Sequence, residues 1–174
     1  PYAPAGAVVG GSWALLGPAR VFATWNEGEL GSYLIDITAQ ILQRTDPETG
    51  APLVDMILDT AEQKGTGKWA SQVALDLGVP APTIAEAVFA RTLSAIKTER
   101  VAAAQVLPGP ETTPWPERSA VLAQLRGALM AAKVCAYAQG FALMRAADRE
   151  QQWQLPMAQV AQVWRAGCII RAHL

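Results

Sequence analysis

The stretch SAVLAQLRGALMAAKVCAYAQGFALMRAADRE, residues 119–150, decides the fold class, because it contains no proline and reads as one uninterrupted helix. If all of it is helical, the helix is on the order of 45 Å long at 1.5 Å per residue. Its ten alanines, together with Gly127 and Gly140, leave small side chains on several faces. Since small side chains let neighbouring helices approach closely, we expect a central helix that is surrounded on most sides.

Shorter helical patterns flank this stretch. The predicted helices cover residues 26–44, 53–65, 68–77, 83–100 and, after Pro156, 157–168. Asn26 with Glu29 has the spacing of a capping box, and so has Thr83 with Glu86. Residues 108–118 are rich in proline and predict a surface loop. No strand pattern of convincing length occurs, so the sequence predicts an all-α, multi-helix domain packed around one long central helix.

Composition narrows the classes of partner. Charged residues make up 17% of the chain, and 14 basic against 15 acidic side chains leave a net charge of -1. Nucleic acid is therefore not an expected partner, and neither is a membrane, since the uncharged first 19 residues lack a basic flank and contain Pro4 and Pro18. With 51% hydrophobic residues, apolar surface is expected to meet another domain or subunit.

Termini and cysteines add two smaller expectations. The chain begins at Pro1 without a methionine, which suggests a piece cut or processed from a longer protein. Cys135 and Cys168 are far apart and match neither a disulfide framework nor a metal-ligand spacing, so we expect reduced, buried thiols and no metal site.

The stretch Gln63-Lys64-Gly65-Thr66-Gly67-Lys68-Trp69 carries the strongest functional pattern. Two glycines between helices free the backbone to approach a ligand, and two lysines supply positive charge, which suits a phosphate. It is not a Walker loop, because Glu62 stands where the leading glycine belongs and Trp69 where Ser or Thr would bind magnesium. On physical grounds alone, a plain turn between helices with two exposed lysines is the favoured alternative.

This loop and the residues around it resemble the 6-phosphogluconate dehydrogenases. The matching segments are Trp25-Asn26-Glu27-Gly28-Glu29-Leu30, Ser32-Tyr33-Leu34-Ile35, Ile57-Leu58-Asp59, the loop itself, Glu86-Ala87-Val88-Phe89-Ala90-Arg91, Lys97-Thr98-Glu99-Arg100, Tyr137-Ala138-Gln139-Gly140-Phe141 and Trp164-Arg165-Ala166-Gly167-Cys168-Ile169-Ile170-Arg171. The resemblance implies residues 21–174 as the family's helical C-terminal domain, incomplete at both ends, and residues 1–20 as a non-matching N-terminal segment.

For function, the resemblance implies a cytoplasmic, homodimeric enzyme of the pentose phosphate pathway. That family oxidises 6-phosphogluconate with NADP and releases carbon dioxide, giving ribulose 5-phosphate and NADPH without a metal. Carried over by motif, Lys64, Thr66 and Arg91 bind the substrate's phosphate end and transfer no protons. Lys68 is expected to be solvated. Without the resemblance, Arg91 would instead pair with Glu99 or Glu86.

Several parts of that enzyme have no counterpart in these residues. No strand followed by a G-x-G-x-x-G turn and a helix occurs, so NADP is expected to bind mainly to a domain outside this sequence. The family's catalytic lysine, glutamate and tail residues also find no match, and His173, the only histidine, corresponds to no catalytic position. We therefore expect no catalytic residue here and an inactive isolated chain. The alternative is a truncated, non-catalytic helical dimerisation module.

One departure from the family works against the phosphate site. Glu62 stands where the family carries a small residue. A carboxylate beside a phosphate loop weakens anion binding by about 1 kcal/mol unless it turns away.

Overall fold

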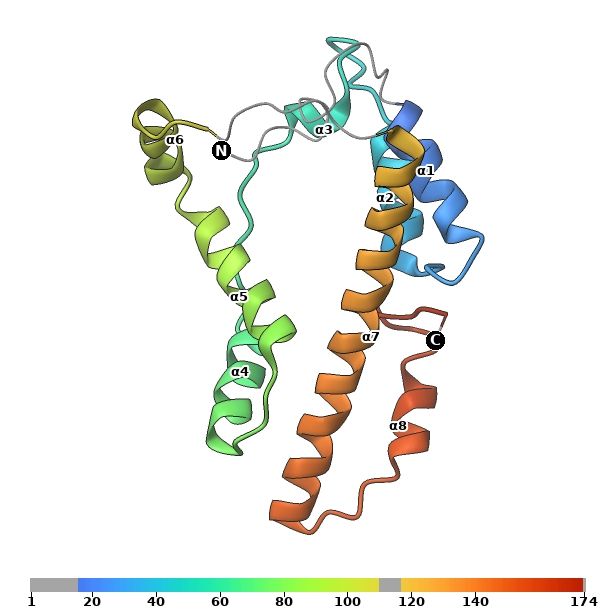
Figure 1. Cartoon of the computed structure of the whole chain (residues 1–174), viewed down its shortest axis with the longest axis vertical. Coiled ribbons are helices and arrows are strands. Elements are labelled where there is room, and N and C mark those ends of the chain that lie inside the picture. The colour runs from blue at the N-terminus through green and yellow to red at the C-terminus, as the bar shows by residue number, and fades with distance from the viewer. Residues whose placement is uncertain (1–15, 110–116, 174) are drawn as a thin grey trace. The chain divides into compact units, whose positions relative to one another are not determined.

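A computed structural model describes residues 16–109 and 117–173, and all of its named secondary-structure elements are helices. In order, the helices are α1 (Leu16–Asn26), α2 (Tyr33–Gln43), α3 (Leu53–Met56), α4 (Thr66–Asp76), α5 (Pro82–Ala95), α6 (Lys97–Val106), α7 (Arg118–Gln151) and α8 (Met157–Val163) (Figure 1). Within the described ranges, β-structure amounts to the isolated bridges Ser32 to Ala172 and Thr45 to Pro52. The predicted all-α class is confirmed.

The long helix is confirmed as well. α7 spans 34 residues, and Glu117 caps it by accepting hydrogen bonds from the backbone N–H groups of Ser119 and Ala120. Its environment differs from the prediction, because Ala146 is the one buried residue of the helix and its most apolar 18-residue window contains none. The small side chains of α7 thus leave faces that the rest of its own compact unit, Asp59–Val160, does not cover.

By length and composition alone, α7 is also the one helix of the described residues that is apolar enough to cross a membrane. The core helix of a water-soluble protein passes the same test, so this property is weak evidence for a membrane.

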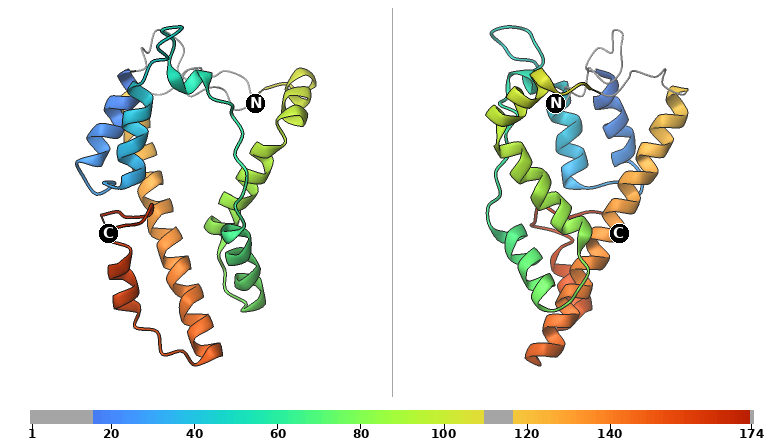
Figure 2. Two further views of the ribbon diagram at one scale, coloured as in Figure 1. Left: turned by 180° about the vertical axis from the view of Figure 1, so that it is seen from behind. Right: turned by 60° about the vertical axis from the view of Figure 1, so that its left-hand side comes forward.

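The described residues divide into two compact units, and residues 16–58 with 161–173 form the first. In it, α1 and α2 lie side by side (Figures 1 and 2), and Leu30, only 1% exposed, fills the turn between them. The C-terminal residues close over this turn: the Tyr33 N–H donates to the Arg171 carbonyl at 3.1 Å, and the His173 N–H donates to the Gly31 carbonyl at 2.8 Å.

The start of α2 corrects one prediction. Asn26 ends α1 instead of capping the next helix, and Ser32 caps α2 by accepting from the Ile35 N–H at 3.2 Å. The Asn26 side-chain oxygen accepts from the Ser32 N–H at 3.1 Å and so supports the turn between the helices. The predicted end near Arg44 is confirmed, since Arg44 is the C-terminal cap of α2.

Asp59–Val160 form the second unit, in which α4 and α5 lie side by side and α5 contacts α7 (Figure 2). The predicted capping box of Thr83 and Glu86 is wrong. α5 begins at Pro82, and the Gln139 side-chain oxygen, from α7, accepts from the N–H groups of Thr83 at 3.0 Å and Ile84 at 3.3 Å. The Gln139 side chain, more than 50 residues away in sequence, therefore caps the start of α5 in place of the predicted local capping box.

Other boundaries also moved. The helix predicted for residues 53–65 ends at Met56 and is followed by irregular backbone, and the run to Arg100 breaks at Ile96 between α5 and α6. The last helix ends at Val163, before Trp164 and Cys168. The predicted loop 108–118 lies largely outside the described residues. Cys135 and Cys168 are free, as predicted, but neither is buried.

Candidate functional site

The glycine loop ends in the first turn of α4. Gly65 precedes the helix with φ +100°, a left-handed backbone conformation that favours glycine, and no side chain caps the helix there. The first N–H groups of a helix have no partner within it and carry the positive end of the helix dipole. Thr66 begins the helix, so its N–H and those of Gly67 and Lys68 belong to this group. This end of α4 suits an anion.

Gly67 lets α4 approach α5 closely. A Cβ atom at this position would lie 2.8 Å from Cγ2 of Val88, closer than carbon atoms normally approach. The second glycine of the loop is thus required by packing, whereas Gly65 is required by its backbone angle.

Arg91 reaches the loop from α5. Its Nε donates to the Glu62 carbonyl oxygen at 3.1 Å, and its Nη2 donates to the same oxygen. Glu62 lies two residues before Lys64, so the structure brings the α5 guanidinium to the backbone just ahead of the loop. Across the described residues Arg91 forms no ion pair with Glu86 or Glu99, the two partners considered as alternatives.

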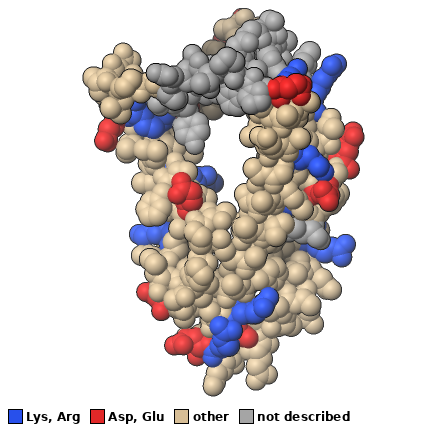
Figure 3. Space-filling model, viewed as in Figure 1, with Lys and Arg blue, Asp and Glu red and all other residues tan. Residues whose placement is uncertain are grey.

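Lys64, Thr66 and Lys68 are positioned at the same end of α4, and both lysines are exposed. In the part of the chain that the structure describes, neither Lys64 nor Lys68 pairs with a carboxylate. The contact that Glu62 makes with Arg91 uses its backbone carbonyl and not its carboxylate. On the face drawn in Figure 3, uncharged side chains cover most of the surface, and Lys, Arg, Asp and Glu side chains are scattered over it.

Residues 59–62, which we call the strap, run just ahead of the loop and are tied to α5 and α6. Besides Arg91, two side chains bind the strap's backbone. Ser94 Oγ accepts from the Ala61 N–H at 3.0 Å, and Arg100 Nη2 donates to the Asp59 carbonyl at 2.8 Å. The Asp59 carboxylate pairs with Lys97 and with Arg100. The hydrogen bond from Lys97 is the main cause that lowers the pKa of Asp59.

Sequence reasoning missed these strap contacts. Lys97 and Arg100 are three residues apart, a spacing that places both on one helical face and could have indicated a shared acidic partner. The choice of Asp59 as that partner depends on how the chain returns past α6, which local spacing does not reveal.

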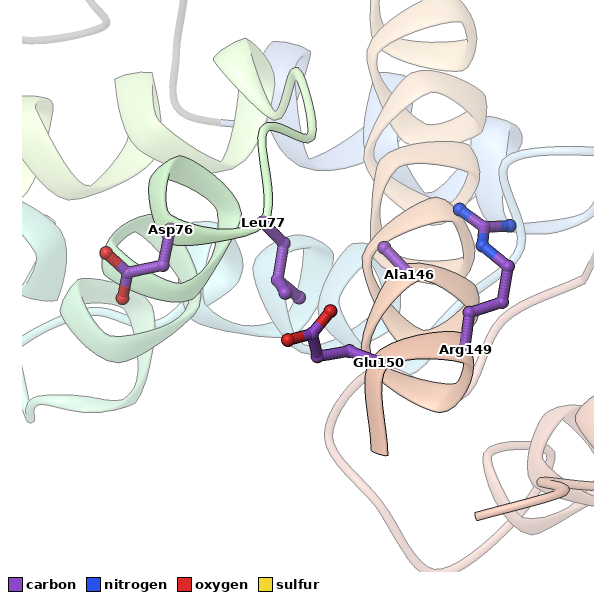
Figure 4. Close-up of a pocket in the computed structure, with 5 residues that line it drawn as sticks. All are labelled: Asp76, Leu77, Ala146, Arg149 and Glu150. Atoms are coloured by element: carbon purple, nitrogen blue, oxygen red, sulfur yellow. The ribbon is translucent and has the colours of Figure 1, made fainter. Parts of the chain in front are cut away.

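A separate hollow of about 350 Å³ lies at the opposite end of α4. It is lined by Asp76, Leu77, Ala146, Arg149 and Glu150 (Figure 4). In that view Leu77 and Glu150 point toward each other, whereas Asp76 turns away. Since α4 begins at Thr66 and ends at Asp76, its whole length separates the hollow from the glycine loop, and the hollow does not belong to that site.

The fold and the loop together define a class: an all-α domain with an uncapped helix N-terminus beside lysine and arginine side chains, an arrangement that suits an anion. The chain matches the family described as 6-phosphogluconate dehydrogenase, C-terminal domain, over residues 17–174, and it belongs to that family. The resemblance first seen in the motifs is thereby confirmed.

Individual relatives agree with the family. The chain is 59% identical over 154 residues to the NADP(+)-dependent, decarboxylating 6-phosphogluconate dehydrogenase of Bacillus subtilis, covering 88% of this chain and 33% of that protein. It is 54% identical over 153 residues to the decarboxylating 6-phosphogluconate dehydrogenase of Lactococcus lactis, covering 88% of this chain and 32% of that protein.

A solved structure extends the likeness to three dimensions. The 6-phosphogluconate dehydrogenase of Plasmodium falciparum, described as apo, with its cofactor NADP+ and with its substrate 6-phosphogluconate, superposes with a TM-score of 0.81 at 42% identity. The match covers 88% of this chain and 33% of that one. The chain spans about a third of the length of the relatives it matches.

Proposed function

We propose that this chain is the substrate-phosphate-binding and dimerisation domain of an NADP-dependent, decarboxylating 6-phosphogluconate dehydrogenase. In the proposed reaction 6-phosphogluconate gives ribulose 5-phosphate, carbon dioxide and NADPH in the cytoplasmic pentose phosphate pathway. Lys64, Thr66 and Arg91 bind the phosphate end of the substrate.

The contact of Arg91 with the Glu62 carbonyl carries this proposal, because it brings α5 to the loop that holds Lys64 and Thr66. A phosphate dianion is well matched by a planar guanidinium fork, a point cation and backbone N–H groups. Arg91 supplies the fork, Lys64 the point cation, and the uncapped start of α4 the N–H groups. The Thr66 hydroxyl adds a neutral donor at the same helix end.

The described residues do not fit the whole of NADP. A dinucleotide site needs a parallel sheet and a Gly-rich turn ahead of a helix, and the described ranges contain only isolated β-bridges. We therefore assign hydride transfer, decarboxylation and proton transfer to no residue of this chain. Its residues hold one end of the substrate and leave the reacting carbons to other groups.

Dimerisation is supported by the thin core. Six apolar residues are buried within the described ranges, and Leu30 is the one large side chain among them. Meanwhile Leu125, Leu129 and Val134 of α7 are 52%, 37% and 45% exposed. Apolar surface of this kind is stabilised by a covering partner, and a second copy of the chain buries the same helix twice through a two-fold axis.

The test measures NADPH formation from 6-phosphogluconate by two proteins. One is this chain alone, and the other is the Bacillus subtilis relative with its matching segment replaced by this chain, which we call the exchanged enzyme. We expect activity only in the exchanged enzyme. Activity of the chain alone would contradict the assignment of catalysis to other parts. If both are silent and the chain still forms a helical dimer, the non-catalytic dimerisation module is the better account.

A further inference from the structure

The strap is irregular backbone that is nonetheless held at three of its four residues. It carries no helix or strand hydrogen bonds of its own, yet Asp59, Ala61 and Glu62 each bond through the backbone to a side chain of α5 or α6. Segments without internal hydrogen bonds are ordinarily the first to open. Side chains that prevent this opening therefore also set the position of Lys64-Gly65-Thr66, which begins two residues after the strap.

Arg100 is the member of this set whose side chain is largely enclosed. Its side chain is only 12% exposed, and its Nη2 donates both to the Asp59 carbonyl at 2.8 Å and to the Ser94 carbonyl at 3.1 Å. Its Nη1 lies 3.4 Å from the Asp59 carboxylate. One planar group from α6 thus joins the strap to the last turn of α5, the helix that carries Arg91.

Enclosing the charged Arg100 side chain costs free energy, because the guanidinium loses contact with water. This cost indicates that the position of the guanidinium against the strap matters more than its hydration. Its Nε is buried without a hydrogen-bond partner in the described structure. A lysine would keep the charge but could not form the fork that reaches two carbonyls and a carboxylate together. By contrast, the Lys97 pair with Asp59 is a partly exposed ion pair, a kind that contributes little on its own.

We propose that Arg100 and Ser94 are positioning residues that hold the strap and thereby set the affinity of the Lys64-Gly65-Thr66 loop for the phosphate of the substrate. This inference rests on the proposed function. Neither residue touches the phosphate; each acts through the backbone of the strap. Their loss increases the number of loop conformations that must be given up when phosphate binds, so it weakens binding and leaves the chemical step unchanged.

The experiment compares Arg100→Lys, Ser94→Ala and a control, Glu99→Gln, in the exchanged enzyme. Glu99 is exposed on the same helix as Arg100 and is not part of the strap contacts. We expect KM for 6-phosphogluconate to rise about tenfold in Arg100→Lys and about threefold in Ser94→Ala, with kcat changed less than about twofold. KM for NADP and all constants of Glu99→Gln should stay as in the unmodified protein.

Hydrogen exchange gives the second readout and separates positioning from general destabilisation. The Ala61 amide should exchange at least about tenfold faster in Arg100→Lys, while amides in the middle of α7 keep their rates. Equal acceleration throughout the second unit would overturn the positioning role, since it would report a loss of stability. Faster exchange in the strap with an unchanged KM would also overturn it, while leaving the proposed function intact.

Failure of the proposed function is recognised separately, by an unmodified exchanged enzyme that produces no NADPH. In that case the positioning role is tested on the 174-residue chain with inorganic phosphate as the ligand. The quantity measured is the phosphate concentration at which hydrogen exchange slows at the amides of Thr66 to Lys68. A shift of this concentration by about tenfold in Arg100→Lys supports the role. An equal concentration in both proteins, or no slowing in the unmodified chain, overturns it.

Discussion

The strap and α7 differ both in how regular their backbone is and in how many of their residues the rest of the chain buries or hydrogen-bonds. α7 has 34 residues of continuous helix, yet one buried residue in the described chain. The strap has no regular structure, yet three of its four residues are bonded to side chains of α5 and α6. Regular backbone satisfies its own hydrogen bonds and needs partners only for its side chains, whereas irregular backbone needs partners for the backbone itself. The two regions therefore fail in different ways when changed.

The largest effect is expected from a charge on the uncovered face of α7. Leu125→Glu would place a carboxylate in each half of the proposed two-fold interface, where desolvation and mutual repulsion oppose association. The dissociation constant of the dimer should rise about a thousandfold, or about 4 kcal/mol, as measured by analytical ultracentrifugation. Gln124→Glu, an exposed polar position one residue away, is the matched control and should have little effect. A dimer that tolerates both changes would show that this face is not the interface.

Removal of Arg91 should have the next largest effect and should be confined to the substrate. Arg91→Ala in the exchanged enzyme removes a charge-assisted contact to phosphate as well as the bond to Glu62, so KM for 6-phosphogluconate should rise about a hundredfold. KM for NADP should hardly change. Lys68→Ala tests the expectation that this lysine is solvated, and it should leave both constants near their original values. Equal increases for substrate and NADP in Arg91→Ala would contradict the phosphate assignment.

Sequence alone was sufficient for the helices whose ends are marked by local chemistry. The absence of proline over residues 119–150 indicated α7, and the end predicted for the helix 68–77 lies one residue from the observed end at Asp76, before Gly78 with φ +64°. It was insufficient where a distant group takes over a local task. Gln139, on α7, caps α5. Ser32 and not Asn26 caps α2, because the Asn26 side chain accepts a hydrogen bond within the preceding turn.

The site divides in the same way. The type and spacing of Lys64, Gly65 and Thr66 pointed to an anion, because glycine freedom and positive charge are properties of the residues themselves. The contact between Arg91 and the strap, and the enclosure of Arg100, depend on two segments about 30 to 40 residues apart lying against each other. The pattern of one helix does not specify such a partner. The roles of Lys64, Thr66 and Arg91 stay predictions until substrate binding is measured.

A smaller effect should distinguish packed from open glycines. At Gly67 an added methyl would meet the stiff Val88 side chain at 2.8 Å, whereas nothing lies within 4 Å of a Cβ at Gly127 in α7. Gly67→Ala should lose about 1 kcal/mol of unfolding free energy, and Gly127→Ala should gain about 0.5 kcal/mol. Both are measured by urea unfolding at a concentration where the chain is monomeric. Adding Val88→Ala to Gly67→Ala should recover part of the loss; no recovery would place the strain elsewhere.

The smallest effect concerns the exposed end of the strap. The pKa of Asp59 lies below its ordinary value, chiefly because Lys97 donates a hydrogen bond to the carboxylate and secondarily because Lys97 and Arg100 are positively charged. The Asp59 carboxylate therefore binds a proton less readily in the folded state than in the unfolded state. The resulting stabilisation is complete above the ordinary carboxyl pKa of about 4 and is lost as the pH falls through the folded value.

An NMR titration of the Asp59 carboxyl carbon measures that difference directly. In Lys97→Met the pKa of Asp59 should move up toward its ordinary value, because the first cause of the shift is removed while the weaker influence of Arg100 remains. The Ala61 amide should keep its exchange rate in this variant, since the Lys97 side chain bonds to the Asp59 carboxylate and the Ala61 amide bonds to Ser94. Faster exchange of the Ala61 amide in Lys97→Met would show that the ion pair with Asp59, and not the Arg100 guanidinium, holds the strap. The strap would then differ from α7 by its charge interactions and not by the hydrogen bonds to its backbone.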